Sequence, residues 1–211
     1  LRLAALLSGA RGMAIDLSRP SLAYAIRKAE EAGIAGIRFV QADILGLAGL
    51  EQRFDMIEAG GVLHHMADPV AGWRVLRDLL RPGGLMLVGL YSALGRRGVT
   101  AAQELLAERG LSGTAEGIRA ARALLAALPE YHPARAATRF QDFYTEAMCR
   151  DLLFHAQEHC FTLRQIAGML DGLDLSFLGF ESIDDGARAA YARAYPDDPR
   201  GLSLANWHAF E

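Results

Sequence analysis

The chain has 211 residues, of which 52% are hydrophobic and 22% are charged, and its formal net charge is −3. This length and composition suit one soluble α/β domain with a sizeable core. The small net charge gives no broad basic field for nucleic acid, so binding to nucleic acid is not expected. Arg, Asp, Gly or Pro interrupts every apolar stretch before it reaches eighteen residues, so no membrane span is expected.

The cysteine content and the first residues bear on the compartment. Only two cysteines occur, Cys149 and Cys160, which argues against a disulfide framework and favours a reduced, cytoplasmic protein. The opening segment LRLAALLSGARG has an apolar part too short for a signal peptide. We interpret it as the end of a helix that begins upstream.

The first half of the chain alternates strand and helix signals. A helix is expected to begin at Ser18, with Pro20 in its first turn and one apolar face, and another to begin at Asp68-Pro69. Strands are expected at residues 12–17 (GMAIDL), 37–40 (IRFV), 54–58 (FDMIE) and 85–90 (LMLVGL), the last after an Arg-Pro-Gly-Gly turn. This alternation predicts a doubly wound α/β fold with a mostly parallel sheet.

The second half is richer in helix signals. Residues 100–128 are expected to form two helices that break near residues 110–113, and residues 131–145 a loop. Further elements are expected at 146–159 (helix), 162–170 (helix, with Thr162 and Gln165 at capping-box spacing) and 175–180 (strand). We therefore divide the chain into a cofactor-binding region (1–98), a helical cap (99–161), and a return helix, strand and tail (162–211).

Three features fall at the carboxyl ends of expected strands, where parallel α/β sheets bind ligands. Asp16 ends the first strand, where an acid can accept hydrogen bonds from both hydroxyls of a ribose, although helix capping is the alternative. Asp43 ends the second, where a carboxylate can accept from an adenine amino group. Residues 59–66 (AGGVLHHM) end the third, and their two glycines let a ligand approach the backbone.

These segments resemble successive motifs of class I S-adenosylmethionine-dependent methyltransferases, which have a Rossmann-like fold. The matching segments are AIDLS, FVQADIL, FDMIEAGGVLHHM followed by Asp68-Pro69, and LLRPGGLMLVGLYS, in order between residues 12 and 92. The resemblance implies S-adenosylmethionine as cofactor and no metal. It also implies ribose binding by Asp16 with Leu17, adenine binding by Asp43 with Ile44, and contacts near the methionine portion and the transferred methyl by Gly60, Gly61 and His64.

The rest of the resemblance is less regular. The segments DLLFHAQEHCFTLRQI, LSFLGFE and LANWHAFE are similar to bacterial methyltransferases that are sometimes fused to tetratricopeptide repeats. The family's first strand and its E-x-G-x-G-x-G loop do not precede Asp16, and a closing antiparallel strand does not follow the tail. We therefore expect a chain truncated at both ends, which alone is unstable or inactive.

Several histidines are candidates for catalysis on an unidentified methyl acceptor, either a small molecule or a protein. His64 and His65 follow a strand end, where a base could deprotonate an oxygen or nitrogen nucleophile, but packing roles are as plausible. His155 begins an H-x-x-E-H pattern that suggests zinc if it is helical, or a substrate-mouth helix in which one histidine is a base or orienting group; a structural role is favoured.

Other residues and other functions stay open. Tyr91 lies at a strand end and could touch substrate, and Arg96 with Arg97 could bind an acidic one, although a solvated loop is the default for the arginines. One alternative function is a Rossmann-type oxidoreductase that binds NAD, since a ribose-binding acid serves either cofactor. The other is a degenerate methyltransferase-like module that binds a partner without catalysis.

Overall fold

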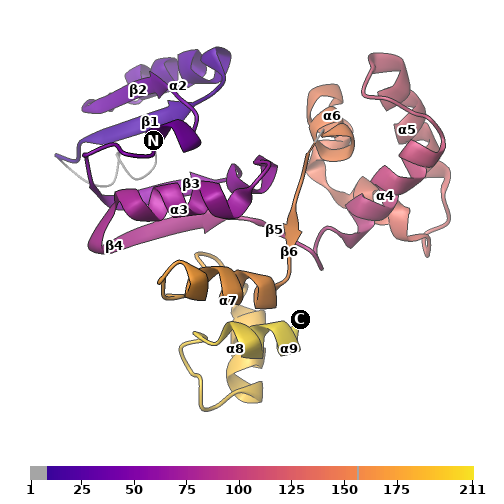
Figure 1. The fold of residues 1–211 in the computed structure, drawn as a ribbon. Coiled ribbons are helices and arrows are strands. Elements are labelled where there is room, and N and C mark those ends of the chain that lie inside the picture. The colour runs from indigo at the N-terminus through magenta and orange to yellow at the C-terminus, as the bar shows by residue number, and fades with distance from the viewer. Residues whose placement is uncertain (1–8, 156) are drawn as a thin grey trace. The chain divides into compact units, whose positions relative to one another are not determined.

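The order of helices and strands follows the predicted alternation through the first half of the chain. A computed structural model describes residues 9–155 and 157–211 (Figure 1); the helix end expected at residues 1–8 lies outside the described residues. The strands are β1 (Gly12–Asp16), β2 (Ile37–Gln41), β3 (Phe54–Gly60), β4 (Leu80–Gly89), β5 (Tyr91–Ser92) and β6 (Cys160–Phe161). The α-helices are α2 (Arg19–Glu31), α3 (Pro69–Leu79), α4 (Arg97–Glu108), α5 (Ala115–Ala127), α6 (Glu146–Phe154), α7 (Leu163–Gly172), α8 (Asp185–Ala194) and α9 (Leu204–Phe210).

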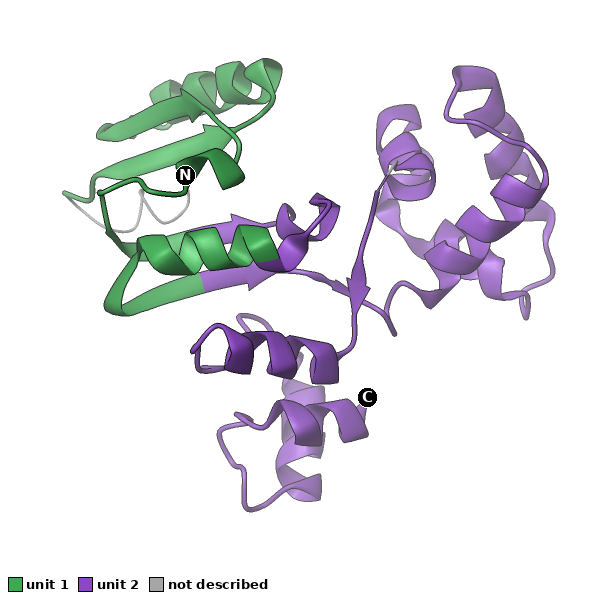
Figure 2. Cartoon of the chain, viewed as in Figure 1, with its two compact units in different colours: residues 1–57, 71–86 green, residues 58–70, 87–211 purple. Residues whose placement is uncertain are grey.

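The chain divides into two compact units, which Figure 2 shows in different colours. Unit 1 comprises residues 1–57 and 71–86, and unit 2 comprises residues 58–70 and 87–211. Short 3₁₀ helices add to both units: η1 (Leu45–Leu47), η2 (Leu63–His65), η3 (Pro133–Arg139) and η4 (Gln141–Tyr144).

Unit 1 is built on the parallel pairing of β1 with β2. The register runs from Gly12 opposite Ile37 to Asp16 opposite Gln41, so both strands end at the same edge. The Ser18 hydroxyl accepts a hydrogen bond from the Ser21 amide at 3.2 Å and caps α2, as predicted.

The predicted apolar face of α2 is only partly covered. Ala29 is buried, whereas Ile26 is 39% exposed. A shallow, mostly apolar depression on this face is lined by Arg19, Pro20, Leu22, Ala23, Ile26 and Gln41.

Strands β3 and β4 form a second two-stranded sheet. The predicted Arg-Pro-Gly-Gly turn is instead part of β4, which begins five residues before the expected strand. Arg81 Nη1 donates to Asp55 Oδ1 at 2.5 Å, which ties the extended part of β4 to β3, while Gly83 keeps a turn-like φ of +75°.

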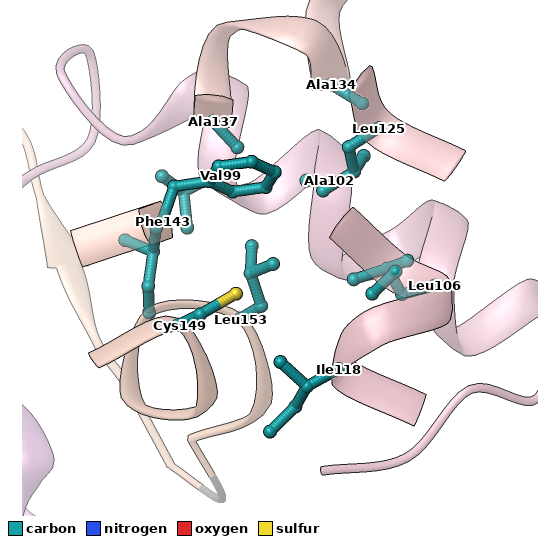
Figure 3. Close-up of a cluster of buried hydrophobic side chains, with 12 residues drawn as sticks. Val99, Ala102, Leu106, Ile118, Leu125, Ala134, Ala137, Phe143, Cys149 and Leu153 are labelled. Atoms are coloured by element: carbon teal, nitrogen blue, oxygen red, sulfur yellow. The ribbon is translucent and has the colours of Figure 1, made fainter. Parts of the chain in front are cut away.

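The main core of unit 2 lies between α4, α5, α6 and the two 3₁₀ helices η3 and η4 (Figure 3). The break between α4 and α5 falls where predicted, but residues 131–145 are not an irregular loop. The His132 side chain accepts from the Ala134 amide and Pro133 follows it, which starts η3. The buried side chains are Val99, Ala102, Leu106, Ile118, Ala121, Leu125, Ala134, Ala137, Phe143, Cys149, Leu152 and Leu153.

Helix α6 is shorter than predicted, which corrects the interpretation of the H-x-x-E-H pattern. The helix ends at Phe154, and His155 already has extended backbone angles (φ −62°, ψ 134°). Downstream, β6 pairs in parallel with β5, with Tyr91 opposite Cys160. The backbone of this segment bonds to other parts of unit 2 in place of its own preceding turn, so the two histidines do not share one helical face.

The strand predicted at residues 175–180 does not form. The segment has no ladder partner among the described residues, and Gly179 has a φ of +127°. Its aromatic rings contact each other and α9 instead: the ring centroid of Phe180 lies 5.0 Å from that of Phe177 and 5.5 Å from that of Trp207.

Helices α7, α8 and α9 gather round one aromatic cluster. The capping box predicted for Thr162 and Gln165 is present at the start of α7. Further along, the rings of Tyr191 and Trp207 stack at 3.7 Å between centroids, and both side chains are buried. None of the described helices combines the length and apolar character needed to cross a membrane.

The loop between α8 and α9 is organised by the Asp198 carboxylate. It accepts from the Tyr191 hydroxyl at 2.5 Å and from the amides of Leu202 and Ser203, each at 2.9 Å. The hydrogen bond from Tyr191 is the largest cause of a lowered pKa for Asp198, while burial raises the pKa of Tyr191 to about 12.

The close approach of α4 and η3 generates a test of the unit 2 core. A Cβ added at Gly98 would lie 2.6 Å from the Ala136 Cβ, so Gly98→Ala is expected to lower the free energy of unfolding by about 1–3 kcal/mol. Gly168 in α7 has open space around it, so Gly168→Ala is the matched control and should stabilise by roughly 0.5–1 kcal/mol. Denaturant unfolding measures both, and equal effects would contradict the packing.

Candidate functional site

The two predicted cofactor acids lie at one edge of unit 1. Asp16 is the last residue of β1, and its Oδ1 accepts from the Ser18 amide at 2.7 Å. Asp43 follows the end of β2, and its Oδ1 accepts from the Leu45 amide at 2.9 Å. In each carboxylate, Oδ2 has no hydrogen-bond partner among the described residues and can accept from a ligand. The structure therefore brings these acids to adjacent strand ends.

The neighbours of the two acids differ in exposure. Leu17 is 67% exposed beside Asp16, whereas Ile44 is buried beside Asp43. An exposed leucine next to a strand-end acid suits contact with an apolar part of a ligand, while Ile44 supports the turn that follows β2. Neither Asp16 nor Asp43 lines the depression on α2, so that depression is separate from the predicted cofactor contacts.

The glycine pair at the end of β3 belongs to unit 2 and forms a sharp turn. Gly61 has a φ of +73°, and its amide donates to the Gly89 carbonyl at 3.4 Å. No atom lies within 4 Å of a Cβ built on either Gly60 or Gly61, so the outer side of this backbone is open. The turn leads directly into η2, which carries His64 and His65.

The three predicted catalytic histidines come together in unit 2 as a stack of rings. The His65 ring centroid lies 4.2 Å from that of His64 and 3.9 Å from that of His155. On the other side, the His64 ring lies 3.8 Å from the Tyr91 ring. His155 also faces Asp151, with 3.9 Å between Nε2 and Oδ1.

Beside this stack lies a nearly buried ion pair. Arg96 Nε donates to Glu158 Oε1 at 2.8 Å, and Nη2 donates to both carboxylate oxygens at 2.6 Å. Both side chains are 9% exposed, and the guanidinium lies 3.9 Å from the Tyr91 ring centroid. Arg96 is therefore neither solvated nor free to bind an acidic substrate, contrary to both sequence-based interpretations.

The segment from Gln157 to His159 is fastened across η2. The His159 amide donates to the His64 carbonyl at 2.8 Å, and Gln157 Nε2 donates to the Met66 carbonyl at 3.4 Å. The Gln157 carbonyl in turn lies 3.1 Å from His65 Nδ1 and 2.8 Å from His155 Nδ1. Residues 157–159 thus contact the His64 carbonyl and the rings of His65 and His155.

Burial shifts the pKa values of several side chains in and beside the histidine stack. His64 is 1% exposed, and burial is the main cause that lowers its pKa to about 4, with His65 adding to the shift. A nearby Gly89 carbonyl opposes the shift, although neither ring nitrogen has a partner of good hydrogen-bond geometry among the described residues. Burial also raises the pKa of Tyr91 and of the Cys160 thiol. His64 is therefore a neutral imidazole at pH 7 and a poor base.

Sequence reasoning singled out the histidines and Tyr91, whose rings the structure brings together, but missed what holds them. Glu158 was expected on a helix, and Gln157 was not singled out at all. The ion pair joins residues 62 positions apart, and no periodic signal in a single sequence connects such positions. Among the described residues, no group of three or more His, Cys, Asp or Glu side chains is arranged to hold a metal ion.

Comparison with known proteins identifies the family. A sequence model described as a methyltransferase domain matches residues 1–126, which is more than half of the chain. The chain therefore belongs to the methyltransferase-domain family. This result confirms the class expected from the motifs, supports S-adenosylmethionine as the cofactor, and decides against the NAD-binding oxidoreductase.

Individual relatives agree with this family. An uncharacterized protein of a Synechococcus strain is 31% identical over 182 residues, which cover 81% of this chain and 43% of that protein. A ubiquinone biosynthesis O-methyltransferase of Cereibacter sphaeroides is 38% identical over 80 residues, covering 37% of this chain and 32% of that enzyme. The chain thus spans less than half the length of these curated relatives.

Solved structures show the same fold. The protein PKMT2 from Rickettsia typhi superposes with a TM-score of 0.72 at 18% identity, covering 98% of this chain and 42% of that one. Its complex with AdoHcy gives a TM-score of 0.68 at 17% identity, with 98% of this chain and 43% of that one covered. The Rossmann-like fold is therefore confirmed.

The lowered pKa of His64 predicts a pH dependence of stability. The unfolded imidazole has a pKa of 6.5 and the folded one about 4, so the unfolded chain binds more protons between these values. Stability should therefore fall as pH drops from 6.5 to 4, by up to roughly 3 kcal/mol. Denaturant unfolding of wild type and His64→Phe should show this component only in wild type; parallel pH curves would contradict the assignment.

The ion pair predicts non-additive effects of substitution. Glu158→Leu leaves the Arg96 charge buried and unpaired, which should lower the free energy of unfolding by about 3–5 kcal/mol. Adding Arg96→Met should recover most of this loss, because an apolar pair of similar volume needs no counter-charge. A double-mutant cycle in denaturant tests the coupling, and additive losses would show that the two side chains act independently.

Proposed function

We propose that the protein transfers a methyl group from S-adenosylmethionine to an acceptor, with Asp16 and Asp43 holding the methyl donor. The observation that carries this proposal is the placement of the two acids on adjacent, in-register strand ends, each with one carboxylate oxygen fixed by a backbone amide. When bound, the cofactor supplies an electrophilic methyl group on a positively charged sulfur.

Each residue has a distinct part in this proposal. Asp16, with Leu17 beside it, would accept from the ribose hydroxyls, and Asp43, with Ile44 beneath its turn, from the adenine amino group. The resemblance assigns Gly60 and Gly61 to the methionine portion, and no Cβ limits the approach of a ligand to their backbone. His64 would contribute a neutral surface near the transferred methyl.

The acceptor and its setting are part of the same proposal. The helices from α4 to α6 form a separate packed cluster, which suits a cap over an acceptor, either a small molecule or a protein. The three-part division at residues 98/99 and 161/162 assigns this role to the middle part. The proposal includes a cytoplasmic location, which fits the free thiols of Cys149 and Cys160. It also includes a fusion to tetratricopeptide repeats, for which the greater length of the curated relatives leaves room.

Calorimetric titration of S-adenosylhomocysteine into the full-length protein tests the cofactor anchors. Asp16→Ala and Asp43→Ala each remove a charged acceptor worth about 1.5–3 kcal/mol. Binding should therefore weaken by roughly 10- to 100-fold in each variant. The measurement also separates an enzyme from a degenerate module that binds only a partner.

The control for this titration is Glu30→Ala, an exposed acid on α2 whose side chain makes no hydrogen bond or ion pair among the described residues. Its affinity should equal that of wild type. Melting curves without ligand show whether each variant is folded. A folded wild-type protein that fails to bind S-adenosylhomocysteine would overturn the proposal and favour the non-catalytic module, whereas equal affinity in all variants would reassign the anchors.

A further inference from the structure

The six ring nitrogens of the histidine stack are not equivalent. Both nitrogens of His64 are buried, and neither has a partner of good hydrogen-bond geometry in the described part of the chain. Both nitrogens of His155 are engaged, with Nδ1 at the Gln157 carbonyl and Nε2 facing Asp151. His65 alone combines an engaged Nδ1 with an Nε2 that has no partner among the described residues, and its side chain is only half-buried.

The contact with the Gln157 carbonyl fixes the tautomer of His65. A carbonyl oxygen can only accept, so His65 Nδ1, at 3.1 Å from it, must carry the hydrogen. The neutral ring then keeps its lone pair on Nε2. The same carbonyl lies 2.8 Å from His155 Nδ1, and that nitrogen also lies 3.3 Å from the Gln157 amide. The backbone of Gln157 thus contacts both rings.

The position of that carbonyl depends on the ion pair next to it. Glu158 follows Gln157 directly in the sequence. The Glu158 carboxylate accepts three short hydrogen bonds from the Arg96 guanidinium. The next residue, His159, is tied to the His64 carbonyl at 2.8 Å. The Gln157 carbonyl is therefore held between two fixed residues, and Arg96 and Glu158 act as positioning residues for the His65 ring.

We propose that His65 Nε2 is the proton acceptor for the nucleophile of the methyl acceptor, which is an amine or a hydroxyl. This inference rests on the proposed function. In the step, the nucleophile's nitrogen or oxygen forms a bond to the methyl carbon while the carbon–sulfur bond breaks and its electron pair stays on sulfur. The proton leaves the nucleophile for His65 Nε2, which gives the methylated acceptor, S-adenosylhomocysteine and a protonated imidazole.

The groups that face His65 are compatible with this role. The adjoining rings are His64, which burial keeps neutral, and His155, whose neighbour Asp151 carries a negative charge. Tyr91 lies edge-on at 5.8 Å between ring centroids. The charges of Arg96 and Glu158 offset each other within their ion pair. A positive charge on His65 would therefore lie near an ion pair whose charges offset each other and near the Asp151 carboxylate on the far side of His155.

The test compares wild type with His65→Asn in the full-length protein. An asparagine amide can still donate to the Gln157 carbonyl but offers no basic nitrogen. The rate of label transfer is measured from methyl-labelled S-adenosylmethionine to protein and small-molecule fractions of the organism's own extract, from pH 5 to 9. We expect the rate to fall by about 100-fold or more. We also expect the rise with pH predicted for wild type to disappear, since an asparagine side chain takes up no proton.

The control is His208→Asn in α9, which lies outside the histidine stack and the proposed cap, and its rate should match wild type. Nitrogen NMR of wild type should show the His65 hydrogen on Nδ1; a hydrogen on Nε2 would overturn the proposal. So would a wild-type rate in His65→Asn, or a reduced rate with an unchanged pH profile.

Titration with S-adenosylhomocysteine distinguishes this inference from the proposed function. Normal affinity together with slow transfer in His65→Asn supports the base. A wild-type protein that binds the ligand but labels no fraction at any pH overturns the base and leaves cofactor binding standing. A wild-type protein that does neither overturns both. If His65→Asn fails to fold, His65→Gln replaces it in the same assays with the same criteria.

Discussion

The Arg96–Glu158 ion pair is the interaction on which the arrangement of the histidines depends. It joins the start of α4 to the segment before β6, and it lies against the Tyr91 ring. Because both charges are almost removed from water, each needs the other, and the geometry tolerates little rotation. The backbone next to Glu158 is therefore fixed, and with it the orientation of the imidazoles on η2.

A different constraint governs the predicted cofactor residues of unit 1. There the side chains are exposed, and their position follows from the backbone alone. Parallel pairing in register brings Asp16 and Gln41 to one edge, and Asp43 follows two residues later. The amides of Ser18 and Leu45 then orient the two carboxylates. The two predicted cofactor acids are thus positioned by strand topology, whereas the histidines are positioned by a buried side-chain network.

The difference explains how much the sequence could predict. Local patterns located β1, β2, the glycine turn after β3 and the capping box at Thr162, because these signals lie within short stretches of sequence. The helix predicted to continue after Phe154 does not form, because the backbone there hydrogen-bonds to residues far away in the sequence, such as His64. Residues 175–180 look like a strand in isolation, but a strand requires a partner, which a single sequence does not specify.

The Asp198 carboxylate has a consequence for how this part of the chain can vary. It accepts from one hydroxyl and two backbone amides, so it needs lone pairs on both oxygens. Asparagine has the same shape but would present its amide hydrogens to a donor, which makes even this small change unfavourable. Gly201 and Ser203 in the same loop are constrained as well, by a φ of +65° and by capping of α9. Substitutions should therefore accumulate elsewhere in this loop more readily than at these three positions.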